Sequence, residues 1–154
     1  MTRRDGLGDP PTRGKPTAFE LVGEFHRAFG LPIRTVPSGS IPRREGAMRQ
    51  LILDEEVEEL RRAVSEADVI GIADALADIV YVICGTAHCY GIDLDAAFAE
   101  VHRSNMTKLD REGLPIHRSD GKVLKGSRYE PPDLKRALGL SSVPPQIERP
   151  DRPG

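Results

Sequence analysis

Residues 51–64 read Leu-Ile-Leu-Asp-Glu-Glu-Val-Glu-Glu-Leu-Arg-Arg-Ala-Val, and this stretch has the periodicity of an amphipathic helix. We predict one long helix from about Pro42 to Glu66. At about 100° per residue, one arc of that helix forms an apolar seam for the core, and an adjoining arc is acidic. The seam consists of Leu53, Val57, Leu60 and Val64, and the acidic arc carries Glu55, Glu56 and Glu59 together with Met48, Ile52 and Ala63.

A second helix of similar design should follow directly. Asp68 is a plausible N-cap, Tyr90 the last helical residue and Gly91 the C-terminal stop. Its predicted apolar seam is Val69, Ile72, Leu76, Ile83 and Ala87. Beside that seam lie Gly71, Asp74, Asp78 and Gly85, and the two glycines leave room for a close approach.

Two shorter helices complete an all-α chain. Thr17 and Glu20 form a capping-box pattern at the start of a helix that Gly30 closes, and another helix should run from Asp93 or Asp95 to about Leu109. Strand signals are nearly absent, so the predicted fold is a four-helix-bundle type completed by oligomerisation. Residues 17–130 form the predicted domain, preceded by a flexible segment, 1–16, and followed by a Pro-rich tail, 131–154.

Composition narrows the class of protein. The 154 residues carry a formal net charge of −2, which argues against a partner such as a nucleic acid polymer or an anionic membrane surface. We expect no bilayer-spanning segment, because no run of about 18 apolar residues is present. The two cysteines, Cys84 and Cys89, lie five apart on one helix and are not expected to form a disulfide. A reducing, cytoplasmic location fits best.

The acidic residues of the two long helices are the main functional signal. If these helices pack antiparallel, the carboxylates that converge are Glu55, Glu56, Glu59, Asp74 and Asp78. Two such charges at 4 Å repel by about 4 kcal/mol at an effective dielectric constant near 20, so the cluster needs protons or cations. Oxygen ligands without nearby Cys or His favour Mg²⁺ or Mn²⁺. The alternative is that these glutamates simply solvate a long helix.

The same residues resemble a known superfamily. Glu55-Glu56-Val57-Glu58-Glu59 fits the EExxE signature of the all-α nucleoside triphosphate pyrophosphatases, which include MazG proteins, dimeric dUTPases and phosphoribosyl-ATP pyrophosphohydrolases. The stretch Ala75-Leu76-Ala77-Asp78-Ile79-Val80-Tyr81-Val82 is similar to the second half-motif, ExxD. The resemblance covers about residues 20–110. It departs from the family pattern at Ala75, where the glutamate of ExxD would stand, and Asp74 is a substitute on spacing grounds only.

The resemblance implies a reaction and its ligands. Glu55, Glu56, Glu59 and Asp78 would hold Mg²⁺, and a metal-bound water would attack the α-phosphorus of a nucleoside triphosphate, releasing monophosphate and pyrophosphate. Glu55 is the candidate for orienting that water or taking its proton. The implied role is a house-cleaning enzyme for unwanted nucleotides such as dUTP, working as a homodimer or homotetramer. The base and sugar cannot be deduced from these residues.

Basic and polar residues after the acidic helices are candidate substrate ligands. Asn105 and Lys108 are spaced to project together, and related small pyrophosphohydrolases look similar through this Ser-Asn-Met-x-Lys segment. A glycine-punctuated loop adds Lys122, Lys125, Arg128 and Tyr129, which suit the far phosphates of a triphosphate. The alternatives are a helix C-terminus that favours cations and a solvated surface loop.

Several other classes lack their motifs. There is no GxxxxGK[ST] or GxGxxG phosphate cradle, and no histidine lies three residues after these glutamates, as a ferritin-like di-iron site needs. Cys84, His88 and Cys89 form too sparse a set for zinc. Three alternatives stay open: a phosphoribosyl-ATP pyrophosphohydrolase, a catalytically weak nucleotide-binding protein, and a helical interaction module.

Overall fold

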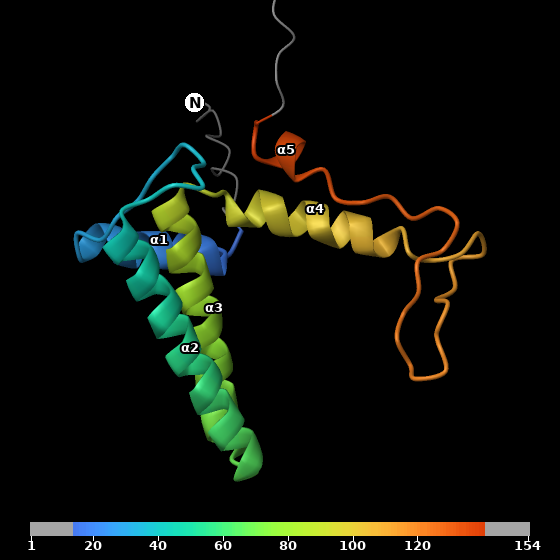
Figure 1. The fold of residues 1–154 in the computed structure, drawn as a ribbon, viewed down its shortest axis with the longest axis horizontal. Helices are drawn as coiled ribbons and strands as arrows, with labels where there is room; N and C mark the ends of the chain where they lie inside the picture. The colour runs from blue at the N-terminus through green and yellow to red at the C-terminus, as the bar shows by residue number, and fades with distance from the viewer. Residues whose placement is uncertain (1–13, 141–154) are drawn as a thin grey trace, which may run out of the picture. The chain divides into compact units, whose positions relative to one another are not determined.

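The computed structural model describes residues 14–140, and within this range the chain is helical (Figure 1). The predicted all-α class is confirmed, since the described part holds no strand and only one isolated bridge, between His117 and Val123. The helices are α1 (Ala18–Ala28), α2 (Arg43–Ser65), α3 (Val69–Tyr90), α4 (Leu94–Met106) and α5 (Leu134–Ala137).

The chain divides into two compact units. Within the described residues, the first unit contains α1, α2 and α3 and comprises the chain up to Ile33 together with Ser40–Cys89. The second unit contains α4 and α5 and comprises Arg34–Gly39 together with the chain from Tyr90 onward. The predicted N-terminal segment 1–16 lies outside the described residues up to residue 13, and so does the predicted tail beyond residue 140.

Helix α1 begins and ends where the sequence signals predict. The Thr17 hydroxyl accepts from the Glu20 backbone N–H at 3.1 Å, and the Glu20 carboxylate accepts from the Thr17 N–H at 2.8 Å. This capping box satisfies two N–H groups that have no partner within the helix. Gly30 follows the helix at a φ of +65°, a left-handed conformation that glycine adopts without a steric penalty.

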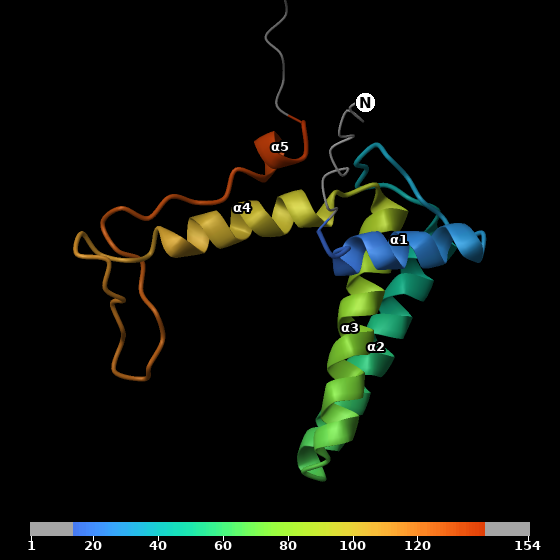
Figure 2. The same ribbon diagram turned by 180° about the vertical axis from the view of Figure 1, so that it is seen from behind.

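Helices α2 and α3 form an antiparallel pair that lies side by side in both views (Figures 1 and 2). The turn between them is short, and the Asp68 carboxylate accepts from the Ile70 N–H at 3.0 Å, which caps the start of α3. The predicted boundaries of both helices agree with the structure to within one residue. The short turn fixes the antiparallel direction on which the convergence of the carboxylates depends.

The predicted seam of α3 is wrong in its direction. Of the predicted seam, Val69, Leu76 and Ile83 are 71%, 49% and 40% exposed and only Ala87 is buried, whereas Ala75 and Val82, about 100° further around the helix, are buried. Helix α3 is apolar on both sides, so periodicity alone could not tell the side that packs against α2 from the side that does not. The small side chains and glycines face α2, because they let two helices approach closely.

By length and composition alone, α3 is apolar enough to cross a membrane, with a mean hydropathy of 1.8 over an 18-residue window. This helix is a candidate by length and composition only, so the expectation of no bilayer-spanning segment stays a prediction. This is weak evidence for a span, because the core helix of a soluble protein passes the same test. Asp74 and Asp78 lie inside the helix, and an ionised carboxylate is costly in a bilayer. Cys84 and Cys89 are both buried and form no disulfide.

In the second unit, the buried Glu100 carboxylate of α4 forms hydrogen bonds with the segment before α5. Glu100 accepts from Arg103 Nε and Nη2, both at 2.9 Å, and from the Asp133 N–H at 2.8 Å. The Ser104 hydroxyl donates to the Glu130 carbonyl at 2.7 Å. Helix α5 was not predicted, since four residues are too few to show a period. Helix α4 ends at Met106 rather than near Leu109.

The Glu100 contacts predict how this attachment depends on pH. The hydrogen bonds from Arg103, and then that from the Asp133 N–H, lower the pKa of Glu100 from its ordinary 4.5 to about 2. A lowered carboxyl pKa stabilises the folded form above pH 4.5, and this contribution is lost as the pH falls toward 2. The protection factors of the amides of residues 130–140, which correct for the intrinsic pH dependence of exchange, should therefore fall across that window. In Glu100→Gln the protection factors should already be lower at neutral pH and show no such fall; a pH profile identical to that of the native chain would contradict this assignment.

Gly91, which follows α3, is predicted to tolerate no side chain. Its φ is +68°, and a Cβ there would lie 2.7 Å from the Val36 carbonyl carbon. The left-handed conformation alone costs a non-glycine residue about 1–2 kcal/mol, and the backbone contact adds to it. Gly91→Ala should lower the free energy of unfolding by at least that amount in urea titrations. Gly39→Ala is the matched control, because nothing lies within 4 Å of its added Cβ; equal losses in both variants would refute the steric argument.

Candidate active site

Glu56 lies at the centre of the acidic residues of the first unit. It is half-buried on α2, and its pKa is raised, first by burial and then by the charges of Asp78, Glu59, Glu55 and Asp74. These four are the other carboxylates that the sequence predicts to converge. The pKa of Glu56 is therefore affected by carboxylates from both helices, as expected if acidic side chains line the contact between α2 and α3.

The register of α2 against α3 follows from contacts on either side of Glu56. A Cβ on Gly71 would lie 3.1 Å from the Ala63 Cβ, and a Cβ on Gly85 would lie 2.7 Å from Arg49 Nη2. Positions 49, 56 and 63 of α2 thus face positions 85, 78 and 71 of α3, each seven residues apart. This spacing keeps one side of each helix toward its partner. Glu56 and Asp78 occupy the middle of the row, between two close approaches.

The donor set fits a hard divalent cation by its chemistry and its charge. All five side chains offer carboxylate oxygens, which suit Mg²⁺ and Mn²⁺. Glu55, Glu59, Asp74 and Asp78 are exposed, so their carboxylates are free to turn. Among residues 14–140 no three Asp, Glu, His or Cys side chains already stand in a metal-binding arrangement. A cation would relieve the repulsion that, after burial, contributes to the raised pKa of Glu56.

Ala75, the departure from the ExxD pattern, lies in the same seam. It is only 3% exposed and sits three residues before Asp78 on the side of α3 that faces α2. By the register above, it lies opposite Glu59. The missing carboxylate therefore leaves a small buried methyl group within the row of acids, while Asp74, one residue earlier, is exposed.

The predicted substrate ligands belong to the second unit. Lys125 Nζ lies 4.3 Å from the centre of the Tyr129 ring, and Arg128 donates to the Asp110 carbonyl. Asn105 is exposed in the last turn of α4. Lys108 follows it, and its carbonyl accepts from the Gly126 N–H at 3.2 Å, which brings the loop back to the end of α4. Lys122 is exposed beside the turn of the loop. Within the second unit, the structure brings Lys125 and Tyr129 together, and the carboxylates belong to the first unit.

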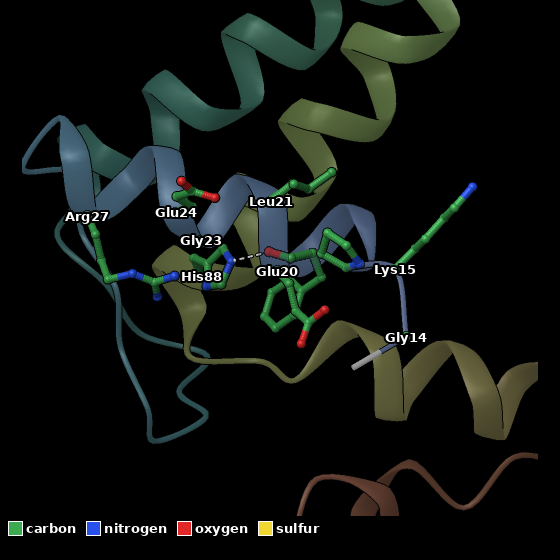
Figure 3. Close-up of a pocket in the computed structure, with 10 residues that line it drawn as sticks. Gly14, Lys15, Glu20, Leu21, Gly23, Glu24, Arg27 and His88 are labelled. Carbon is green, nitrogen blue, oxygen red and sulfur yellow. Dashed lines mark hydrogen bonds between the residues drawn. The ribbon is translucent and has the colours of Figure 1, made fainter. Parts of the chain in front are cut away.

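A hollow beside α1 contains none of the predicted site residues (Figure 3). His88 of α3 lies at its base, and its Nε2 donates to the Phe19 carbonyl at 2.9 Å while its ring stacks on Phe19. Lys15, Glu20, Glu24 and Arg27 line the rim with both signs of charge. Nearby, His26 is buried and Nδ1 donates to the Pro32 carbonyl, and burial lowers its pKa. Both histidines serve packing rather than the acidic site.

Comparison with known protein families identifies the chain as a member of the MazG-like all-α superfamily, as the acidic half-motifs predict. Residues 22–105, more than half of the chain, match the family model of phosphoribosyl-ATP pyrophosphohydrolase, and the chain belongs to that family. The match includes all five carboxylates and ends at Asn105, so the other predicted substrate ligands lie beyond it.

One curated relative is similar over much of the chain. It is the uncharacterized protein L479 of Acanthamoeba polyphaga mimivirus, which is 38% identical over 104 residues. The aligned part is 66% of this chain and 39% of the viral protein. The chain therefore spans about two fifths of the length of that relative.

Proposed function

We propose that this chain is a divalent-metal-dependent pyrophosphohydrolase that converts nucleoside triphosphates, or related nucleotides, to the monophosphate and pyrophosphate. The observation that carries the proposal is the gathering of carboxylates around the half-buried Glu56, whose pKa is raised by burial and then by four carboxylates from two helices. Membership of the phosphoribosyl-ATP pyrophosphohydrolase family supports the same reaction class. Phosphoribosyl-ATP is a second candidate substrate, favoured by that match.

The carboxylates would divide the work between them. Glu56, Glu59 and Asp78 are the proposed ligands of Mg²⁺ or Mn²⁺, with Asp74 as an additional one. The ion supplies charge neutralisation at the phosphoryl oxygens and lowers the pKa of water. Glu55 is proposed to orient the attacking water and accept its proton, while the bond from the α-phosphorus to the bridging oxygen breaks and pyrophosphate leaves.

Exposed apolar residues on α3 support a homo-oligomer. Val69, Leu76, Val80 and Ile83 recur at intervals of seven, four and three residues, so they form one stripe on the side of α3 away from α2. A continuous apolar stripe of this kind is typical of a protein–protein interface. We propose that a second copy of the chain covers it, giving at least a dimer.

A nucleotide screen tests the proposed reaction. Canonical and modified nucleoside triphosphates and phosphoribosyl-ATP would be incubated with Mg²⁺ or Mn²⁺, and pyrophosphate release would be measured. We expect metal-dependent release from at least one of them and none in EDTA. Metal-dependent nucleotide binding without any release would favour the catalytically weak binding protein, for which Ala75 is the supporting observation. If the chain neither binds nor hydrolyses any of these nucleotides, the remaining reading is a helical interaction module.

A further inference from the structure

Arg49, which the sequence analysis did not single out, joins α2 to α3 by directional contacts. Its Nη2 donates to the Val82 carbonyl at 2.7 Å, and its Nε donates to the Thr86 hydroxyl at 3.2 Å. The Thr86 hydroxyl in turn donates to the Val82 carbonyl at 2.8 Å. The guanidinium thus binds one specific turn of α3. Hydrogen bonds from a charged group are stronger than those between neutral groups.

Gly85 provides the space for this contact. A Cβ at that position would stand 2.7 Å from Arg49 Nη2 and 2.8 Å from His26 Nε2. These distances are shorter than a carbon atom tolerates, so any side chain at position 85 would displace the guanidinium or the imidazole. The predicted close approach at Gly85 is therefore an approach of Arg49 and His26 to the backbone of α3.

The other contacts of the same row do not fix the register by themselves. Ala63 against Gly71 is an apolar contact between small groups, which permits sliding. Glu56 and Asp78 carry like charges, so their interaction pushes the helices apart. A slip of one helical turn would move one helix by about 5.4 Å along the other and separate the carboxylates that should share a cation.

We propose that Arg49 is a positioning residue, whose grip on Val82 and Thr86 holds α2 and α3 in the register that places Glu56 opposite Asp78. The inference rests on the proposed function, because it assigns Arg49 a role in assembling that metal site. Arg49 lies two helical turns from Glu56 on the same side of α2, so it acts through the helix and needs no contact with the substrate.

The first test measures metal dependence in Arg49→Met, Arg49→Lys and Gly85→Ala. We expect the Mg²⁺ concentration for half-maximal activity to rise about tenfold or more in Arg49→Met and Gly85→Ala, a loss typical of disturbed ligand positioning. High Mg²⁺ should restore most of the turnover, and Arg49→Lys should lie between. Arg61→Met is the matched control, since Arg61 pairs only locally with Glu58 on the exposed side of α2. A fall in thermal stability with an unchanged Mg²⁺ requirement would overturn the proposal.

The second test reads the register without any activity. Ala63→Cys and Gly71→Cys, combined with Cys84→Ala and Cys89→Ala, place two Cβ atoms 3.1 Å apart. A disulfide needs about 3.5–4.5 Å, so it forms after a shift of a few tenths of an ångström, with the Asp68 carboxylate, 2.7 Å from the added Cβ, turning aside. Oxidation should link them readily with Arg49 present and much less in Arg49→Met or Gly85→Ala. Equal yields would overturn the proposal. If the native chain hydrolyses no nucleotide, the proposed function fails, but the disulfide yield still tests whether Arg49 holds the register of α2 against α3. If Arg49→Met or Gly85→Ala does not fold, Arg49→Lys takes its place.

Discussion

Asp78→Asn and Glu56→Gln are expected to reduce pyrophosphate release at least about a hundredfold. Each change keeps the size of the side chain and removes the negative charge that a divalent cation requires. Loss of a group that merely orients a metal ligand already costs about 10–100-fold, so loss of a ligand should cost at least as much. Initial rates at saturating Mg²⁺, with the substrate found by the nucleotide screen, provide the measurement.

Glu58→Gln is the matched control for these variants. Glu58 belongs to the same acidic run but pairs with Arg61 at 3.0 Å on the exposed side of α2. Its loss should leave the rate within about twofold, because exposed ion pairs contribute little. If Glu58→Gln were as damaging as Asp78→Asn, position within the seam would not matter, and the proposed assignment of ligands would be wrong.

Ala75→Glu should make the stability of the chain strongly dependent on Mg²⁺. The residue is 3% exposed and faces α2, so an added carboxylate lies among Glu56, Glu59 and Asp78. Without metal, like charges at about 4 Å cost on the order of 2–4 kcal/mol, and protonation of the new group relieves part of this cost. With Mg²⁺, the same carboxylate completes the ExxD pattern and becomes a ligand. The unfolding temperature would be measured without Mg²⁺ and at Mg²⁺ concentrations that increase in about tenfold steps.

Ala75→Gln separates the charge from the volume. It adds the same bulk to a buried position without a negative charge, so it should be destabilised to the same extent with and without Mg²⁺. We expect the Mg²⁺-induced rise in the unfolding temperature to be larger in Ala75→Glu than in the native chain. A similar response of both variants to Mg²⁺ would show that Ala75 does not lie within reach of the acidic group.

The elements with local signals could be predicted from the sequence. The helix ends depend on contacts within a few residues: Thr17 and Glu20 cap α1, Asp68 caps α3, and Gly91 adopts the left-handed conformation after α3. These effects do not depend on the rest of the chain. The acidic arc of α2 and the aspartates of α3 were also visible, because helical periodicity is fixed by the backbone. These signals gave the helix boundaries and the carboxylates that act on Glu56.

The features that depend on packing could not be predicted. Helix α3 is apolar around most of its circumference, so its sequence alone does not show that Ala75 and Val82, rather than Leu76, turn inward. Arg49 resembles any surface arginine until Gly85 is seen to leave space for it. The hydrogen bonds of Glu130 with Ser104 and of Asp133 with Glu100 join segments about thirty positions apart, and no local pattern encodes them.

Binding of Mn²⁺ in the absence of nucleotide is the measurement that decides whether the acids of α2 and α3 form a metal site. Electron paramagnetic resonance of free Mn²⁺ would be recorded while the native chain, Asp78→Asn and Glu58→Gln are titrated. We predict saturable binding by the native chain and by Glu58→Gln, and an affinity at least about tenfold weaker in Asp78→Asn. Equal affinity in all three proteins, or no saturable binding by the native chain, would contradict the proposed site.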